Sequence, residues 1–413
     1  MTRIDRNIFL LFATRIIRLF AYGFLSIVLV LYLAKTGLSN VQIGLLLTCT
    51  LIGDAVITLW LTTSADRIGR RRMLIVGALL MVMAGAVFVL THNYAFLIIA
   101  AIIGVISPSG NEIGPFLSIE QASLSELLPD NRRTSVFAWY NMVGSFATAF
   151  GSLAGGWATQ LLQGNGFAPI HAYQVILIGY AAAGGILALL FLFLSPAVET
   201  KTVPEGPRLR RSLGLHKSKK IVFKLSALFS LDAFAGGFVI QSLIVYWFHV
   251  RFDMDTGVLG SIFFGANVLA GISALLAVKI AAKIGLLKTM VYTHVPSNIL
   301  LCLVPLMPFS WLAITVLLLR FSISQMDVPT RQSYTMAVVA PDERSAASGV
   351  TAIARSVGAS ISPTLAGVFL ASSWWMSAPF FVAGGLKLVY DFALYRSFQT
   401  VKPPEEEKRA VSA

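Results

Sequence analysis

The stretch Ser64-Ala65-Asp66-Arg67-Ile68-Gly69-Arg70-Arg71-Arg72 joins two long apolar segments and decides the fold class of the chain. It holds four arginines and one acid within a few residues. Such a concentration of charge cannot lie in hydrocarbon, so the stretch must face water at a membrane surface. Because cytoplasmic loops carry the excess of Lys and Arg in membrane proteins, the charge places this loop in the cytoplasm.

The composition is that of an integral membrane protein. Hydrophobic residues make up 56% of the chain and charged residues only 12%, whereas soluble domains average about 25% charged residues. The 413 residues leave room for about a dozen spans of ~20 residues each. The net charge of +13 comes from basic residues that separate apolar segments rather than from one soluble domain. No nucleic-acid partner is therefore expected, and the lipid bilayer is the expected surrounding.

Hydropathy predicts twelve spans, and their even number places both termini on one side of the membrane. The basic residues that flank the spans gather on that same side, and only Lys35 and Arg251 lie opposite. Both termini are therefore expected in the cytoplasm, in a multi-pass protein of a bacterial inner membrane. The predicted spans are 8–34, 41–64, 73–91, 95–128, 133–161, 172–195, 222–249, 256–280, 288–308, 311–340, 345–372 and 376–398.

The chain divides into two halves that look like copies of each other. We predict a first six-helix bundle over 1–195, a basic linker over 196–221, a second bundle over 222–398 and a tail over 399–413. Short matches recur in the same order in both halves, as parallel six-helix repeats would require. The matches pair Ala21–Phe24 with Ala235–Phe238, Arg67–Gly69 with Lys283–Gly285, Pro129–Arg132 with Pro341–Arg344, and Leu153–Gly155 with Leu365–Gly367.

The order Asp-Arg-x-Gly-x-Arg-Arg from Asp66 to Arg72 resembles the loop between helices 2 and 3 of the major facilitator superfamily, although Thr62 replaces that loop's usual first glycine. The segment Gly151–Gly156 resembles the superfamily's antiporter motif, with Ser152 in place of its proline. This resemblance implies an all-α membrane protein with twelve transmembrane helices in two pseudo-symmetric six-helix bundles. It also implies a conformational gate, although simple helix packing explains the glycines equally well. The implied gate residues are Asp66, Arg67, Gly69, Arg70, Arg71, Gly151, Gly155 and Gly156.

Ionisable residues inside predicted spans are functional candidates because burying a charge in a bilayer is costly. The repeat matches Arg18 with Asp232 at equal depth in spans one and seven, and Glu120 and Arg331 lie at similar depths in spans four and ten. In the resembled superfamily these four spans line the central cavity, so both pairs are expected to face the transport path. Structural ion pairing within each bundle is the alternative. The candidates for the substrate and ion path are Arg18, Glu112, Glu120, Asp232, Asp327, Arg331 and Arg355.

Span four contains an expected break between Ser107 and Pro115. Two prolines and two glycines fall within these nine residues, and each proline removes a backbone donor and clashes with the preceding turn. Glu112 lies in the break and Glu120 follows it. We expect Glu120 to carry the coupling proton, with Glu112 in reserve, unless Glu120 forms a permanent clasp with Arg331.

The sequence contains no P-loop, no nucleophile elbow and no metal-binding spacing of histidines or cysteines, so neither an enzyme, a cofactor nor a metal is expected. A monomeric secondary transporter of a small organic solute, driven by a proton gradient, is the expected function. The partial antiporter motif favours drug- or metabolite-like efflux by antiport. The alternative is proton-coupled uptake of an organic anion, which Arg18, Arg331 and Arg355 favour. A non-transporting receptor on a transporter fold is a remote alternative.

Overall fold

The computed structural model describes residues 3–112, 114–128, 130–199, 215–340 and 343–401. All regular secondary structure among these residues is helical. The residues divide into two compact units, unit 1 with Met1–Pro204 and Ile240–Asn267, and unit 2 with Glu205–Val239 and Val268–Ala413. Each of the twelve predicted spans corresponds to one helix or to two consecutive helices, which confirms the predicted twelve-helix membrane fold.

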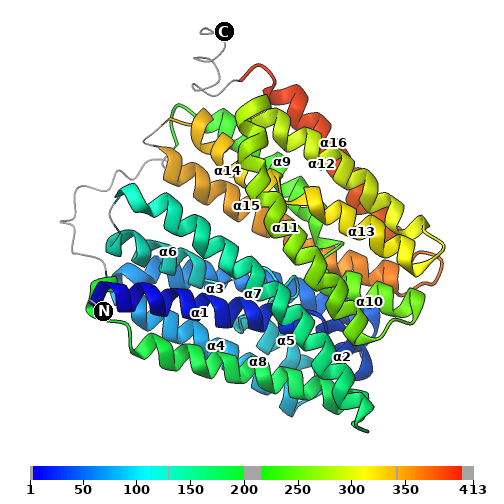
Figure 1. The fold of residues 1–413 in the computed structure, drawn as a ribbon. Helices are drawn as coiled ribbons and strands as arrows, with labels where there is room; N and C mark the ends of the chain where they lie inside the picture. The colour runs from blue at the N-terminus through cyan, green and yellow to red at the C-terminus, as the bar shows by residue number, and fades with distance from the viewer. Residues whose placement is uncertain (1–2, 113, 129, 200–214, 341–342, 402–413) are drawn as a thin grey trace. The chain divides into compact units, whose positions relative to one another are not determined.

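Unit 1 contains the helices of the first six spans and a short part of the second half. Within it α1 packs against α7 and α8, α4 packs against α8, and α3 packs against α4 and α5 (Figure 1). Its helices are α1 (Arg3–Ser26), α2 (Leu29–Lys35), α3 (Asn40–Ile68), α4 (Arg70–Leu90), α5 (Tyr94–Ile103), α6 (Phe116–Leu127), α7 (Asp130–Gly164), α8 (Pro169–Leu192), α10 (Gln241–Phe252) and the first part of α11 (Thr256–Ile284), with the 3₁₀ turn η1 (Pro196–Val198).

Unit 2 contains the rest of the second half. Here α9 packs against α15 and α16, while α12 packs against α13, α14 and α16. A buried apolar core of Leu225, Phe229, Met290, Tyr334 and Leu394 holds α9, α12, α14 and α16 together. The helices are α9 (Lys219–Gly237), the remainder of α11, α12 (Leu286–Leu303), η3 (Val304–Leu306), α13 (Ser310–Ser324), α14 (Asp327–Val338), α15 (Arg344–Leu370) and α16 (Ala378–Phe398).

The break predicted in span four is present. Helix α5 ends at Ile103 and α6 begins at Phe116. Between them Gly110 and Gly114 have φ values of +69° and +80°, a region that side chains other than glycine rarely adopt. The hydroxyl of Ser107 donates to the carbonyl of Asn111 at 2.7 Å, and the carbonyl of Pro108 accepts from the backbone of Ser242 at 3.2 Å. The break therefore exposes backbone groups that other segments of unit 1 satisfy.

Spans one, seven and ten are also each made of two helices, which was not predicted. The interruptions fall between α1 and α2, between α9 and α10, and between α13 and α14. The interruptions in spans one and seven fall at matching positions of the repeat. The matched segment Ala21–Phe24 precedes the end of α1, and Ala235–Phe238 covers the end of α9. Within the described ranges, nine helical stretches are long and apolar enough to cross a membrane, and two of them, Lys219–Phe252 and Ser310–Val338, run across the interruptions in spans seven and ten.

Glycines of α7 allow close helix packing within unit 1. A Cβ atom at Gly151 would overlap the carbonyl of Phe20, and one at Gly155 would overlap the carbonyl of Phe24. A Cβ at Gly156 would overlap the carbonyl of Thr256 in α11. The packing role considered for these glycines is therefore real, and their gating role stays a prediction.

Two buried charge clusters form the candidate transport site

The basic loop that the sequence singled out is a glycine hinge between α3 and α4. Gly69 joins the two helices with φ +116°, and its counterpart Gly285 joins α11 and α12 with φ +92°. The carboxylate of Glu199 accepts hydrogen bonds from the backbone N–H groups of Arg70 at 2.6 Å and Arg71 at 3.3 Å. An acid at a helix N-terminus satisfies free N–H groups and complements the helix dipole.

The guanidinium groups of this loop have different surroundings. Arg70 is buried and donates to the carbonyl of Val198 at 3.3 Å, and Arg71 donates to the carbonyl of Leu194 at 3.3 Å. Arg67 is exposed. The side chain of Asp66 lies outside the described residues, so its role in the gate stays a prediction.

The first buried cluster, the Arg18 cluster, lies in unit 1 and contains Arg15, Arg18, Glu112, Glu120 and Tyr140. Arg18 binds Glu120 with both terminal nitrogens, at 2.6 and 2.8 Å, and binds Glu112 through Nε at 3.0 Å. Arg15 binds Glu112 at 2.6 Å. The side chains of Arg18 and Glu120 are completely buried, while that of Glu112 is 13% exposed. Two arginines thus balance two carboxylates.

Glu120 has a full set of hydrogen-bond donors. In addition to the two bonds from Arg18, it accepts from the Thr14 hydroxyl at 3.0 Å and from the Tyr140 hydroxyl. An ionised carboxylate accepts about four hydrogen bonds, so these donors occupy its acceptor sites. Glu120 therefore has the geometry of a structural clasp with Arg18 of its own unit.

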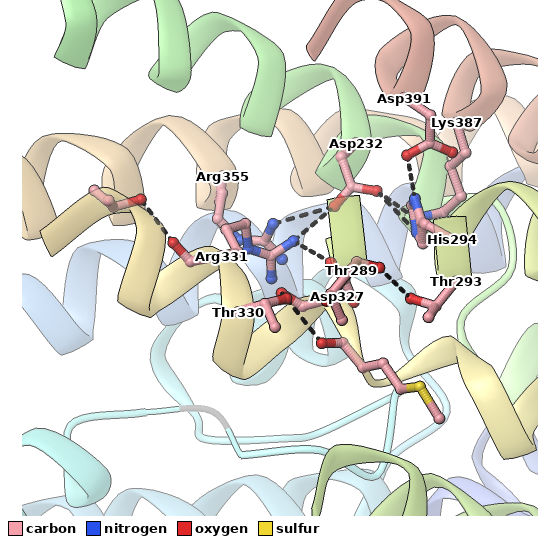
Figure 2. Close-up of polar contacts among 12 residues, drawn as sticks. Asp232, Thr289, Thr293, His294, Asp327, Thr330, Arg331, Arg355, Lys387 and Asp391 are labelled. Carbon is pink, nitrogen blue, oxygen red and sulfur yellow. Dashed lines mark hydrogen bonds and ion pairs between the residues drawn. The ribbon is translucent and has the colours of Figure 1, made fainter. Parts of the chain in front are cut away.

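The second buried cluster, the Asp232 cluster, lies in unit 2 and has Asp232 of α9 at its centre. Figure 2 shows Arg331 and Arg355 approaching Asp232 from one side, and His294 and Lys387 from the other. The distances to its carboxylate oxygens are 3.2 Å from Arg331, 3.2 Å from Arg355, 2.5 Å from Lys387 and 3.8 Å from His294 Nε2. Arg331 also binds Asp327, four residues before it in α14, at 2.8 Å.

This second cluster extends to the ring of His294 and is not balanced in charge. The Nδ1 atom of His294 lies 2.7 Å from Asp391, whose other oxygen accepts from Asn298 at 2.9 Å. Arg320 adds a further cation, whose charge interacts with Asp327 and Asp232. With a neutral imidazole the cluster holds four cations, Arg320, Arg331, Arg355 and Lys387, against the carboxylates Asp232, Asp327 and Asp391. Among the three cations that contact Asp232, Arg355 is the most accessible, with 34% of the side chain exposed.

The structure shows the ion pairs that the predicted path residues form within each unit. In unit 1, Arg18 pairs with Glu112 and Glu120. In unit 2, Asp232 and Asp327 pair with cations of that unit. This is the ion pairing within each bundle that was the alternative to a shared path. The relations between Arg18 and Asp232 and between Glu120 and Arg331 stay predictions.

Three residues of the Asp232 cluster were missed in the sequence. Lys387 and Asp391 are ionisable residues four positions apart inside the predicted span 376–398, which is the same signal that identified the other candidates. His294 lies near the middle of its span but has no sequence neighbour that marks it. Only the packing of α12 against α16 and α9 brings these three side chains together.

Comparison with known proteins decides the family. A model of the Major Facilitator Superfamily matches residues 11–363. The chain belongs to the Major Facilitator Superfamily. It is 29% identical over 420 residues to the uncharacterized membrane protein YJR124C of Saccharomyces cerevisiae, covering 94% of this chain and 93% of the yeast protein. It is 21% identical over 157 residues, or 38% of this chain and 39% of the relative, to the quinolone resistance protein NorA of Staphylococcus aureus.

Solved structures of superfamily members share the fold. A bacterial homolog of the human lysosomal transporter Spinster, in an inward-facing and occupied conformation, gives a TM-score of 0.73 with 14% identity, over 95% of this chain and 96% of that chain. A D-xylose–proton symporter gives 0.70 with 16% identity, over 94% and 97%. The superfamily and these neighbours point to a transporter rather than an enzyme, and a secondary transport mechanism follows from the family.

Proposed function

We propose that this superfamily member carries a small organic anion together with a proton by alternating access. The observation that supports an anion is the gathering of three cations, Arg331, Arg355 and Lys387, on the single carboxylate of Asp232, with the charge of Arg320 acting on the same carboxylate. An uncompensated buried charge is costly, and a bound anion would reduce that cost. A bound anionic substrate would therefore compensate positive charge in the cluster.

We assign the binding of the anionic substrate to Arg355. Its guanidinium contacts the carboxylate of Asp232 at 3.2 Å and is 34% exposed, whereas Arg18 is completely enclosed. A guanidinium presents parallel N–H donors that fit a carboxylate in a bidentate pair. Arg355 therefore combines the chemistry for binding an organic anion with access to solvent.

Proton-coupled export by antiport is the second candidate. It is favoured by the partial likeness to the quinolone resistance protein NorA and by the glycine segment Gly151–Gly156. A proton gradient would drive the anion inward in a symport and an exported solute outward in an antiport. In both cases we place the protein as a monomer in a bacterial inner membrane, with both termini in the cytoplasm and no cofactor.

Reconstituted protein tests these candidates. Proteoliposomes are loaded with one solute from a panel of benzoate, succinate, gluconate, glucose and ethidium, and counterflow is measured with and without a pH gradient. The proposal expects counterflow of at least one of the three anions, with accumulation on the side away from the acidic compartment. Transport of ethidium toward the acidic compartment, with no counterflow of any anion, would overturn the proposal in favour of export.

A further inference from the structure

We propose that His294, held by Asp391, is the proton-binding site of this transporter and that its proton controls the pairing of Asp232 with Arg355. This inference rests on the proposed proton-coupled transport, and it identifies the coupling group within the same cluster. Figure 2 shows the imidazole between the carboxylates of Asp232 and Asp391. Histidine is the side chain whose unperturbed charge change falls between about pH 5 and 8.

The hydrogen bonds of His294 determine which nitrogen can take up a proton. Nδ1 lies 2.7 Å from Asp391, and because a carboxylate only accepts, the Nδ1–H group donates to it. Asn298 donates to the other oxygen of Asp391 at 2.9 Å and fixes the carboxylate in place. The lone pair of Nε2 then remains on the side of Asp232, whose nearest oxygen is 3.8 Å away. His294 is thus oriented with one basic nitrogen toward the centre of the cluster.

The charged and titratable groups around His294 come from every helix that packs near it. Two carboxylates, those of Asp232 and Asp391, face the ring directly. Lys387 binds the oxygen of Asp232 that Nε2 faces. The surrounding groups are Lys387, Tyr390 and Asp391 of α16, Asp232 of α9, Asp327 and Arg331 of α14, Arg320 of α13 and Arg355 of α15.

Proton uptake at Nε2 would rearrange the bonds to Asp232. A proton from water adds to the Nε2 lone pair, and the new Nε2–H group becomes a donor toward Asp232 Oδ1. Asp232 already accepts from Lys387, Arg331 and Arg355, so a further donor weakens its hold on each of them. Arg355, the most exposed of the three, is then the cation most readily released to an organic anion. Loss of the proton to water reverses the exchange.

The only covalent bond that the protein forms or breaks in this coupling is the N–H bond of His294. The unprotonated site holds Arg355 on Asp232 and disfavours the anion. The protonated site carries an additional positive charge and favours the anion. Proton and anion therefore stabilise each other's binding, which is the reciprocity that a symport requires.

Glu120 provides the structural contrast that points to His294. Its oxygens already accept from Arg18, Thr14 and Tyr140, so protonation of Glu120 would oppose several existing donors. In His294 the Nε2 nitrogen has no donor within hydrogen-bonding distance among the described residues. Of the two groups, only the histidine can accept a proton without first losing a partner.

Two measurements test the assignment, and the first does not require a substrate. The protein contains five histidines, so ¹⁵N-histidine labelling in lipid nanodiscs gives few signals, and the signal lost in His294→Gln identifies His294. We expect this signal to respond to pH, as gain of a proton at Nε2 requires, and the response to change in Asp391→Asn. A His294 signal that does not titrate would overturn the proposal, even if every variant transports poorly.

The second measurement uses whichever of benzoate, succinate and gluconate gives the strongest counterflow. In His294→Gln the ratio of gradient-driven uptake to counterflow should fall about tenfold, equivalent to about 1.4 kcal/mol. Asp391→Asn should lower the same ratio, and His171→Gln, at the exposed start of α8, should leave it unchanged. A normal ratio in His294→Gln would refute the coupling role. Absence of counterflow for all three anions would instead refute the proposed substrate class, and the NMR titration would still decide the proton site.

Discussion

The Arg18 cluster and the Asp232 cluster occupy corresponding helices of the two halves but solve the problem of buried charge differently. In the Arg18 cluster two arginines meet two glutamates, and Glu120 has donors on both oxygens. In the Asp232 cluster one aspartate is shared by three cations, and a histidine lies at 3.8 Å. A balanced and saturated cluster stabilises one arrangement, whereas a shared carboxylate can change partners when a proton or an anion arrives.

Residues at equivalent positions of the repeat therefore need not have equivalent functions. Asp232 corresponds to Arg18 in the repeat, yet each recruits opposite charges from its own unit. The first half thus has a charge-balanced ionic core. The second half has the cluster in which we propose the proton-binding site. This asymmetry can be tested by breaking each cluster in turn.

The largest effect is expected for Arg18→Gln. This change leaves the carboxylates of Glu112 and Glu120 with fewer counter-charges in a buried site, and breaking such a pair costs about 3–5 kcal/mol. Thermal unfolding in detergent should show a clear fall in the melting temperature. Arg18→Gln combined with Glu120→Gln should recover part of the loss, and a melting temperature equal to that of the unmodified protein would disprove the clasp.

A smaller effect is expected for Glu120→Gln, because the charged hydrogen bonds that it removes are worth about 1.5–3 kcal/mol. Since Glu120 is a structural clasp, counterflow and gradient-driven uptake should fall together and their ratio should stay constant. The two assays on the same proteoliposomes provide the measurement. Selective loss of gradient-driven uptake would return the coupling role to Glu120.

Arg355→Gln should change substrate binding more than stability. The side chain is 34% exposed and shares Asp232 with two other cations, so Asp232 keeps partners after its loss. We expect the KM for the transported anion to rise about tenfold, or about 1.4 kcal/mol. Arg355→Lys should restore part of the affinity, and the exposed Arg396→Gln is the matched control. An unchanged KM in Arg355→Gln would remove this residue from the substrate site.

Asp66→Asn tests whether the two halves also differ at their basic loops. The basic loop of the first half has Asp66, while its copy in the second half has Ala282 at that position. We expect Asp66→Asn to slow turnover severalfold with little change in KM, because the acid acts on the conformational cycle rather than on binding. Measured initial rates over a range of substrate concentrations separate the two parameters. A change in KM alone would contradict a gating role.

The smallest effect is expected at Glu343, which caps the N-terminus of α9. Its buried carboxylate accepts from the backbone N–H groups of Lys217 and Ser218, each at 2.8 Å, and from His216. Burial raises the pKa of the Glu343 carboxyl, but the hydrogen bonds from Ser218 and His216 outweigh it and hold the pKa well below its usual range. A lowered pKa means that this stabilisation is complete above the ordinary value of about 4.3 and is lost as the pH falls through the folded-state pKa.

Glu343→Gln should therefore lower the melting temperature slightly at neutral pH, and the difference from the unmodified protein should shrink at acidic pH. Glu199→Gln is the matched change at the N-terminus of α4. Thermal unfolding of both variants over a series of pH values provides the measurement. A difference for Glu343→Gln that grows as the pH falls would contradict the sign of the pKa shift.

The sequence by itself determined the membrane fold, the twelve spans and the break in span four. These features depend on properties that can be read along the chain, such as runs of apolar residues and the backbone restrictions of Pro108 and Pro115. The sequence also identified Arg18, Glu112, Glu120, Asp232, Asp327, Arg331 and Arg355 as candidates, because any ionisable residue in a span is conspicuous.

Only the tertiary structure decided which of these charges meet. The pairing depends on how the helices are rotated and packed, and equal depth in two spans does not reveal it. Thus Glu120 meets Arg18 of its own unit, and His294 joins Asp391 across α12 and α16 from positions 97 residues apart. Hydropathy depends on each residue alone, whereas an ion pair depends on two side chains at about 3 Å, and packing alone sets that distance.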